Sequence, residues 1–175
     1  MTDVPDTIDL ERHRDFEGRR YLVWPRWLGL GLLGLFCLLG LANVFGQRPS
    51  TSAASAPAAR LTVRAPTKLR GGLLYSARFQ ISARRELKNA FLVLDSGWAQ
   101  EMAINTIEPS PLGESSRNGR LSFQLGHIPA GGSYVLFMQF QVNPTNVAWH
   151  RPQGVELDDG DTKVLAIDRR VDVYP

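Results

Sequence analysis

The side chains best suited to acid–base chemistry in this sequence are those of His127 and His150, because a hydrolytic triad needs an imidazole between a nucleophile and an orienting acid. Neither histidine lies in a G-x-S-x-G or H-E-x-x-H motif, and the sequence contains no phosphate-binding glycine loop. An enzyme would have to combine His150 with the acids of the Asp158 to Asp161 segment, as a cell-envelope hydrolase, and this stays the alternative. The sequence itself predicts no catalytic residue and favours a protein that is not an enzyme.

The Asp158 to Asp161 segment places three carboxylates within four residues, and carboxylate oxygens are ligands that calcium prefers. Short apolar runs flank the segment, so Asp159-Gly160 also fits a tight hairpin turn. The pattern favours the turn and leaves calcium binding open. The single cysteine, Cys37, excludes an internal disulfide and a cysteine-based zinc or iron–sulfur cluster. We expect no cofactor and no metal site, with calcium binding by the Asp158 to Asp161 turn as the open alternative.

One uncharged segment stands apart from the rest of the chain. Leu28 to Phe45 is eighteen residues long and contains eight leucines. A helix of this length measures about 27 Å, close to the roughly 30 Å hydrocarbon core of a bilayer. Trp24 and Trp27 precede the segment, where amphipathic rings suit the headgroup region. The sequence predicts a transmembrane helix over residues 28–45, with the lipid bilayer as its surroundings.

The distribution of arginines predicts the orientation of that helix. Only Arg48 and Arg60 lie close to its C-terminal end, whereas five arginines lie close to its N-terminal end: Arg12, Arg14, Arg19, Arg20 and Arg26. By the positive-inside rule, the tail of residues 1–27 is cytoplasmic and the C-terminal part is extracytoplasmic. Residues 18–23 also resemble a twin-arginine export signal, which would be cleaved. The apolar run is longer than an ordinary signal sequence requires, which favours an uncleaved anchor.

Residues 46–59 contain a Ser/Ala/Pro tract without apolar periodicity, and we expect a flexible linker there. Residues 60–175 have the usual size of one domain. Apolar residues alternate with polar ones along Leu74 to Ala83 and again along Ser133 to Val142, as in strands with one buried face. About six further short runs are separated by turn sequences such as Asn118-Gly119. This pattern predicts an all-β, immunoglobulin-like sandwich outside the membrane.

Three segments carry a resemblance to a known family. The order runs from Glu86 to Leu94, through Gly97-Trp98, to Gly119 to Tyr134, which reads GRLSFQLGHIPAGGSY. It resembles the immunoglobulin-like conserved-repeat domains of bacterial surface proteins. The chain as a whole is also similar to uncharacterised bacterial single-pass membrane proteins. The resemblance implies a β-sandwich fold and assigns no activity.

Charge and loop composition indicate where a partner could bind. Residues 60–100 hold eight basic and two acidic side chains, a net charge of +6, so an anionic envelope polymer is one possible partner. The longest polar loop is another candidate surface, because loops on a rigid scaffold often bind partners. Its candidate partner-binding residues are Glu108, Ser110, Glu114 and Arg117.

Small residues in the apolar segment suggest a second kind of contact, because they let membrane helices approach closely. We select Gly34 and Gly40 as candidate helix-packing residues. Taken together, the sequence predicts a membrane-anchored, non-catalytic interaction module. Its expected partner is another membrane or envelope protein or an anionic envelope polymer, with no nucleic acid and no small-molecule substrate.

Overall fold

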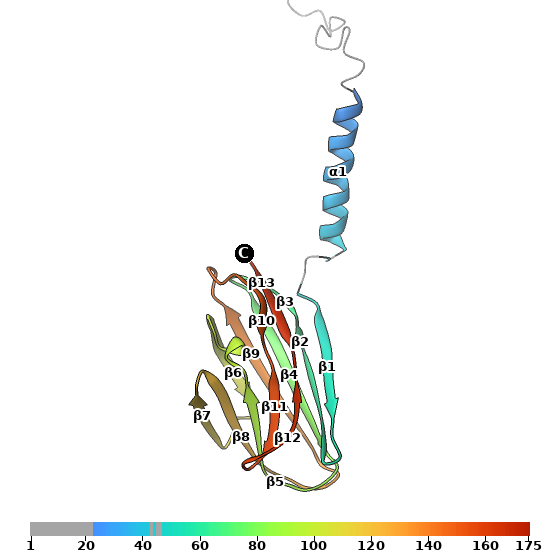
Figure 1. The fold of residues 1–175 in the computed structure, drawn as a ribbon. Coiled ribbons are helices and arrows are strands. Elements are labelled where there is room, and N and C mark those ends of the chain that lie inside the picture. The colour runs from blue at the N-terminus through green and yellow to red at the C-terminus, as the bar shows by residue number, and fades with distance from the viewer. Residues whose placement is uncertain (1–22, 43, 45–46) are drawn as a thin grey trace, which may run out of the picture. The chain divides into compact units, whose positions relative to one another are not determined.

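The computed structural model describes residues 23–42, 44 and 47–175. The chain divides into two compact units, Met1–Phe45 and Gly46–Pro175. The first contains the helix α1, and the second contains the strands (Figure 1). The predicted cytoplasmic tail, apart from its last five residues, lies outside the described part of the chain.

The helix α1 spans Val23–Leu41, so it begins five residues before the predicted span of 28–45 and ends four residues before the end of that span. Pro25 falls in its first turn, where a helix tolerates a missing N–H, and Trp24 and Trp27 are therefore helical. The segment Trp24–Leu41 is long and apolar enough to cross a membrane, and no part of it is buried within the chain. An apolar helix is thus confirmed, with its boundaries shifted.

The β unit contains thirteen strands among the described residues, where the sequence predicted about eight. They are β1 (Pro49–Ser55), β2 (Ala59–Pro66), β3 (Lys68–Arg70), β4 (Leu74–Ala83), β5 (Leu87–Leu94), β6 (Met102–Glu108), β7 (Gly113–Arg117), β8 (Arg120–Ile128), β9 (Ser133–Val142), β10 (Ala148–Pro152), β11 (Val155–Asp159), β12 (Thr162–Ile167) and β13 (Arg170–Tyr174). A single 3₁₀ turn in this unit, η3 (Ser96–Trp98), follows β5.

These strands form two facing layers (Figure 1). The first layer has the order β1-β2-β4-β9-β6 and the second has the order β12-β11-β5-β8-β7. A smaller sheet, β10-β13-β3, continues the second layer, because β10 leads into β11 and β12 leads into β13. All pairings are antiparallel except that of β3 with β13. The all-β, immunoglobulin-like sandwich predicted from the sequence is confirmed.

The two strands with the clearest alternation occupy the middle of the first layer. β4 and β9 have the predicted boundaries and pair along their whole length, from Leu74 opposite Gln141 to Ser82 opposite Ser133. Their inward side chains meet the second layer in one core cluster. Trp98 lies fully buried in that core, with its ring 5.2 Å from Phe79 and 5.5 Å from Phe140. Alternating polarity therefore sets both the register and the buried face.

The predicted flexible linker over residues 46–59 differs from the structure, because residues 49–55 form the edge strand β1. β1 pairs with β2 from Pro49 opposite Pro66 to Ser55 opposite Arg60. Every second side chain of β1 is half-buried, and Ala54 packs against the core. Backbone hydrogen bonds do not depend on apolar side chains, so a small, polar segment can add a strand to an existing edge. The sandwich therefore begins at Pro49 rather than at residue 60.

Candidate interaction surface

Two edge strands run along the same lateral side of the sandwich. β6 ends the first layer and β7 ends the second layer, and the short segment Pro109–Leu112 joins them. Within the described part of the chain, neither strand has a second strand partner on its outer edge. Unpaired edges present backbone N–H and C=O groups that can pair with another chain. This side of the sandwich is therefore open to a partner.

A groove of about 560 Å³ lies between these two edges. The side chains of Ile104, Ile107 and Leu121 are half-buried against the core and form its apolar floor. The buried ring of Phe123 also lines the groove, and polar side chains form the rest of the lining: Asn105, Thr106, Glu114, Ser115 and Ser116. An apolar centre with a polar rim is the usual composition of a protein–protein interface. We call this feature the edge groove.

Local irregularities place the groove residues. A register shift between Ile104 and Thr106 leaves Asn105 as an extra residue in β6, so Ile104 and Ile107 both point toward the core. On the other side, Leu112 donates its N–H to the carbonyl of Gln124. The Leu112 side chain also covers Gly126, which has a φ of +83° and lacks space for a Cβ. These contacts anchor the start of β7 on β8.

The structure brings one of the four predicted partner-binding residues into this groove. Glu114 lines it, whereas Glu108 is exposed at the end of β6 and Ser110 is exposed in the connecting segment. Arg117 ends β7, and its side chain lies outside the described part of the chain. The sequence prediction treated this connection as a loop, whereas Gly113–Arg117 form a strand, and partner binding there stays a prediction. It missed the floor residues, because their periodicity is interrupted by the bulge at Asn105.

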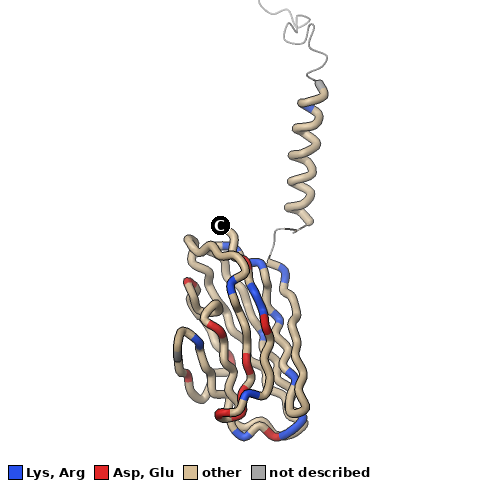
Figure 2. Tube along the Cα trace, in the orientation of Figure 1, with Lys and Arg blue, Asp and Glu red and all other residues tan. Residues whose placement is uncertain are grey.

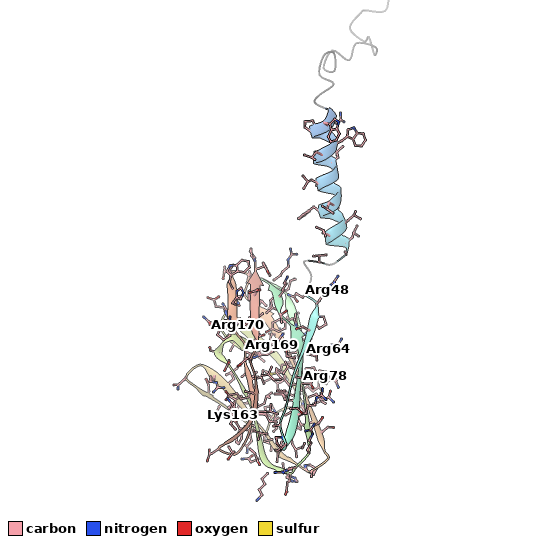
Figure 3. All side chains as sticks on the ribbon, turned by 45° about the vertical axis from the view of Figure 1, so that its right-hand side comes forward. Arg48, Arg64, Arg78, Lys163, Arg169 and Arg170 are labelled. Atoms are coloured by element: carbon pink, nitrogen blue, oxygen red, sulfur yellow. The ribbon has the colours of Figure 1, made fainter. Side chains whose placement is uncertain are left out.

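The basic residues of the sandwich do not gather in one patch. Figure 2 shows blue segments at both ends of the β unit and along its strands. On the outer face of the first layer, Arg64 and Arg78 are opposite each other in register (Figure 3), and the guanidinium of Arg78 lies 5.3 Å from the ring centre of Phe137. The predicted binding of an anionic polymer stays untested.

Arg169 forms a buried polar cluster that the sequence did not reveal (Figure 3). Its guanidinium donates to the Gln153 side chain at 2.8 Å and to the carbonyls of Ala65 and Pro66 at 2.6 and 2.7 Å. Burial lowers its pKa to about 10, so it remains charged at neutral pH. Its guanidinium carbon also lies 5.4 Å from the ring centre of Trp98. This cation ties the joint between β12 and β13 to the end of β2.

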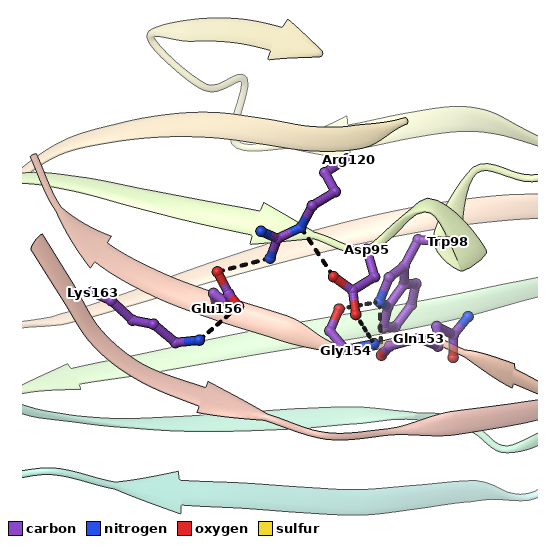
Figure 4. Close-up of polar contacts among 7 residues, drawn as sticks. All are labelled: Asp95, Trp98, Arg120, Gln153, Gly154, Glu156 and Lys163. Atoms are coloured by element: carbon purple, nitrogen blue, oxygen red, sulfur yellow. Dashed lines mark hydrogen bonds and ion pairs between the residues drawn. The ribbon is translucent and has the colours of Figure 1, made fainter. Parts of the chain in front are cut away.

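A chain of charged side chains crosses the outer face of the second layer (Figure 4). Arg120 on β8 contacts Asp95 at 3.1 Å and Glu156 on β11 at 2.7 Å, and Lys163 on β12 contacts Glu156 at 2.7 Å. Partial burial raises the pKa of Glu156, but the hydrogen bonds from Lys163 and Arg120 outweigh it and leave that pKa below its ordinary value. The Lys163–Glu156 contact links the adjacent strands β12 and β11, and the Arg120–Glu156 contact joins β8 to β11 across the intervening β5. These ion pairs between strands of one sheet indicate a structural role.

Asp95 connects the charged chain to the core. Its second carboxylate oxygen accepts the N–H of Gly154 at 3.0 Å. The indole N–H of Trp98 donates to the carbonyls of Gln153 and Gly154, each at 3.1 Å (Figure 4). The connection between β10 and β11 is therefore held by hydrogen bonds to the buried Trp98 and to the half-buried Asp95.

The structure does not bring together the residues of the hydrolase alternative. His150 lies on β10, where its N–H donates to Asp172 at 2.7 Å, whereas the Asp158 to Asp161 segment forms the turn at the far end of β11. His127 contacts Glu86 at 2.9 Å in an exposed pair. Asp159 pairs with Thr162 across a two-residue turn, as the hairpin interpretation predicted. Among the described residues, no group of three His, Cys, Asp or Glu side chains is arranged to bind a metal.

Gly34 and Gly40 both lie within α1. A Cβ added at either position would meet no atom within 4 Å in the described part of the chain. Both surfaces are therefore accessible to a second helix, and their role in packing stays a prediction.

No protein-family model matches the chain, and no curated protein matches it. Among solved structures, it is similar to AvmM, which catalyses macrocyclization in alchivemycin A biosynthesis, with 8% identity, a TM-score of 0.46 and coverage of 74% of this chain and 90% of that one. It is also similar to CaCohA2 from Clostridium acetobutylicum, with 11% identity, a TM-score of 0.44 and coverage of 69% and 93%. A non-cellulosomal cohesin from Archaeoglobus fulgidus matches with 12% identity, a TM-score of 0.34 and coverage of 73% and 86%. The resemblance to conserved-repeat domains stays a prediction, and the geometry of this chain carries the proposals below.

Proposed function

We propose that this chain is a membrane-anchored, non-catalytic interaction module. In this proposal α1 spans a lipid bilayer, the N-terminal tail is cytoplasmic, and the sandwich presents the edge groove to a partner protein of the cell envelope. The observation that carries the proposal is that the two edge strands β6 and β7, which lie on either side of an apolar floor, have no partner on their outer edges within the described residues. Such a site can add a strand of the partner and bury its apolar side chains at the same time.

The groove is suited to a polypeptide rather than to a small charged ligand. Its apolar lining consists of Ile104, Ile107, Leu121 and Phe123, and its polar lining carries only one charged side chain, Glu114. An extended segment with alternating apolar residues would match both the floor and the free backbone groups. The partner is therefore expected to contribute a strand.

Charge introduced at the rim tests this site. Thr106→Lys and Ser115→Lys change exposed residues on β6 and β7, and should abolish recovery of the partner by affinity purification of the full-length chain from its own membranes. The matched control is Thr51→Lys with Ser55→Lys, which changes exposed residues of the edge strand β1. The proposal fails if the groove variants recover the same proteins as the wild type.

Membrane anchoring has its own test. The full-length chain should stay in the membrane fraction after alkaline extraction, and removal of residues 23–41 should release it. Protease added outside intact, wall-free cells should digest the sandwich if the N-terminus is cytoplasmic. A sandwich protected from protease would reverse the proposed orientation without affecting the edge groove.

A further inference from the structure

The chain enters the sandwich at one of its two ends, after α1. β1 begins at this end with Pro49, which is opposite the last residue of β2, Pro66. The start of β4, the end of β9 and the strands β3 and β10 meet at the same end (Figure 1). We call it the proximal end, because along the chain it comes eight residues after Leu41, the last residue of α1.

Large apolar side chains are exposed at the proximal end. Among the described residues of the β unit, six large apolar side chains are exposed, and four of them lie here: Leu73 at 48%, Leu74 at 50%, Val147 at 50% and Trp149 at 63%. Exposed apolar residues that are scattered singly need no explanation, but a concentration at one end marks an interaction surface. We call these four residues, with Lys68 and Arg70, the proximal rim.

The segments that carry the proximal rim pack on one another. The N–H of Gly72 donates to the carbonyl of Val142, and the backbone of Gly71 lies so close to Pro144 that a Cβ would come within 2.7 Å of its carbonyl oxygen. The N–H of Gly71 also donates to the carbonyl of Tyr174, whose ring centre lies 5.1 Å from that of Trp149. These contacts hold the three segments that carry the rim together at this end of the sandwich.

A bulge in β10 presents Trp149. Ala148 is opposite Val173 and Arg151 is opposite Val171, so Trp149 and His150 together face the single residue Asp172. His150 adopts a positive φ of 52°, which is uncommon for a residue other than glycine. Bulges commonly redirect a side chain next to a functional surface. Here the bulge leaves the indole ring edge-on to Tyr174 and largely exposed.

The charges around the rim are mainly positive. Lys68 and Arg70 alternate with the buried Leu69 along β3, so both point outward. The nearby acids have other contacts: Asp172 accepts the N–H of His150, and Glu101 lies 3.8 Å from Arg151. No ion pair involves Lys68 or Arg70 in the part of the chain that the structure describes. In the pairing of β13 with β3, Asp172 lies opposite Lys68, so its carboxylate offsets part of that charge, whereas Arg70 lies opposite Tyr174. The rim thus combines a net positive charge on β3 with exposed tryptophan and leucine.

We propose that the proximal rim docks on the surface of an anionic lipid bilayer, with Trp149, Leu73 and Leu74 entering the headgroup region and Lys68 and Arg70 contacting lipid phosphates. Tryptophan is enriched at membrane interfaces, and each basic side chain near an anionic surface adds attraction. The docking rests on the proposed membrane anchoring by α1. Eight residues can span no more than about 27 Å, so an inserted α1 keeps the proximal end within reach of the same bilayer.

Quenching of Trp149 by brominated lipids tests the docking in the full-length chain. The sequence has four tryptophans, and Trp24→Phe with Trp27→Phe leaves the fully buried Trp98 and the exposed Trp149 as the remaining tryptophans, which can be excited selectively over tyrosine. In vesicles of phosphatidylcholine and phosphatidylglycerol with brominated acyl chains, emission should be quenched and shifted to shorter wavelength. Adding Trp149→Phe gives the baseline, because Trp98 in the core stays out of contact with lipid.

The charge requirement has a matched control. Lys68→Glu with Arg70→Glu should lower the ratio of docked to undocked molecules at least about tenfold, and quenching should then approach its value in phosphatidylcholine alone. Arg60→Glu with Arg85→Glu, at the opposite end of the sandwich, should leave quenching unchanged. Near-ultraviolet circular dichroism of each variant checks that the sandwich remains folded.

Each outcome separates the two proposals. If the chain floats with the vesicles while Trp149 remains unquenched, docking is wrong and anchoring stands. If quenching is the same with and without phosphatidylglycerol, and is insensitive to the Lys68 and Arg70 changes, the proposed anionic-lipid contact is wrong. If the chain does not float with any vesicle, anchoring by α1 fails first, and the docking proposal fails with it.

Discussion

On one lateral side of the sandwich the edge strand β1 lies against the edge strand β12, whereas on the other side β6 and β7 leave the edge groove between them. The closed side uses the small side chains of β1, of which Ser50, Ser52 and Ala54 are half-buried. The open side has isoleucines at the corresponding depth, Ile104 and Ile107. Small residues let strands of opposite layers approach, whereas larger, half-buried residues leave an apolar floor accessible from outside.

The two lateral sides of this β-sandwich therefore differ in how their edge strands are covered. Exposed edges risk unwanted pairing with other chains, and covering them removes the risk. The strand β1 and the buried Arg169 secure one lateral side of the sandwich. On the other side, no further strand covers β6 and β7 among the described residues. The edge that stays open among the described residues is the observation on which the proposed function rests.

The largest effect is expected on the closed side, at Arg169. Arg169→Ala removes the donor to the Gln153 side chain and to the carbonyl of Pro66, and leaves the carbonyl of Ala65 with only the hydroxyl of Ser50, so it should lower the free energy of unfolding by about 3 kcal/mol. Urea unfolding of the detergent-solubilised chain, followed by near-ultraviolet circular dichroism, measures this. The adjacent, exposed Arg170 gives the control, since Arg170→Ala should change stability by less than about 0.5 kcal/mol. Equal effects at both positions would show that Arg169 does not secure the closed side.

A smaller loss is expected within β1 itself. Ala54→Asp introduces a charge where the alanine packs against the core, and should cost about 2 kcal/mol. Its neighbour Ala53 is exposed, so Ala53→Asp should be nearly neutral. The same unfolding measurement distinguishes a strand from a tether. If both substitutions are neutral, β1 contributes little to the closed side.

The sequence predicted the central strands well because their chemistry is local. Alternation along β4 and β9 identifies a buried face without reference to any other element. β1 was missed because its Ser/Ala/Pro composition has no apolar period, and its strand conformation depends on an edge provided by β2. The boundaries of α1 were shifted because the apolar run does not show where the helical hydrogen bonds begin.

The candidate site was predictable only in part. The sequence shows the polar connection between β6 and β7, from Glu108 to Arg117. The groove, however, depends on the two sheets ending on the same side of the sandwich, and no local stretch of sequence contains that information. Arg169 was also hidden, because an arginine beside another arginine is ordinarily exposed. Only the break between β12 and β13 turns its side chain inward to meet carbonyls more than one hundred residues away in the sequence.

The charged chain across the second layer runs from the edge strand β12 to β8 and should contribute less to stability. Glu156→Gln weakens the contacts with Arg120 and Lys163, and should cost about 0.5 kcal/mol at pH 7. The pKa of Glu156 in the folded chain lies below its ordinary value of 4.5, so its stabilising contribution is present above about pH 4.5 and is lost as the pH falls through the folded value. Unfolding curves of wild type and variant should therefore converge in acid. A difference independent of pH would assign the effect to packing.

The smallest effect is expected at Asp158, and it should have the opposite sign. Burial, reinforced by the charge of Glu156, raises the pKa of Asp158 above its ordinary value of 3.8, and one of its carboxylate oxygens is buried without a hydrogen-bond partner among the described residues. The ionised form is therefore disfavoured in the folded state, and its cost is fully present above the raised pKa and fades as the pH falls toward 3.8. Asp158→Asn should raise the midpoint of urea unfolding at pH 7 slightly, and the gain should disappear in acid. Asp161→Asn in the exposed turn gives the control without such a gain. A loss of stability in Asp158→Asn at neutral pH would mean that the carboxylate supports the junction of β11 with the closed edge strand β12, and that the charged chain includes a fifth member.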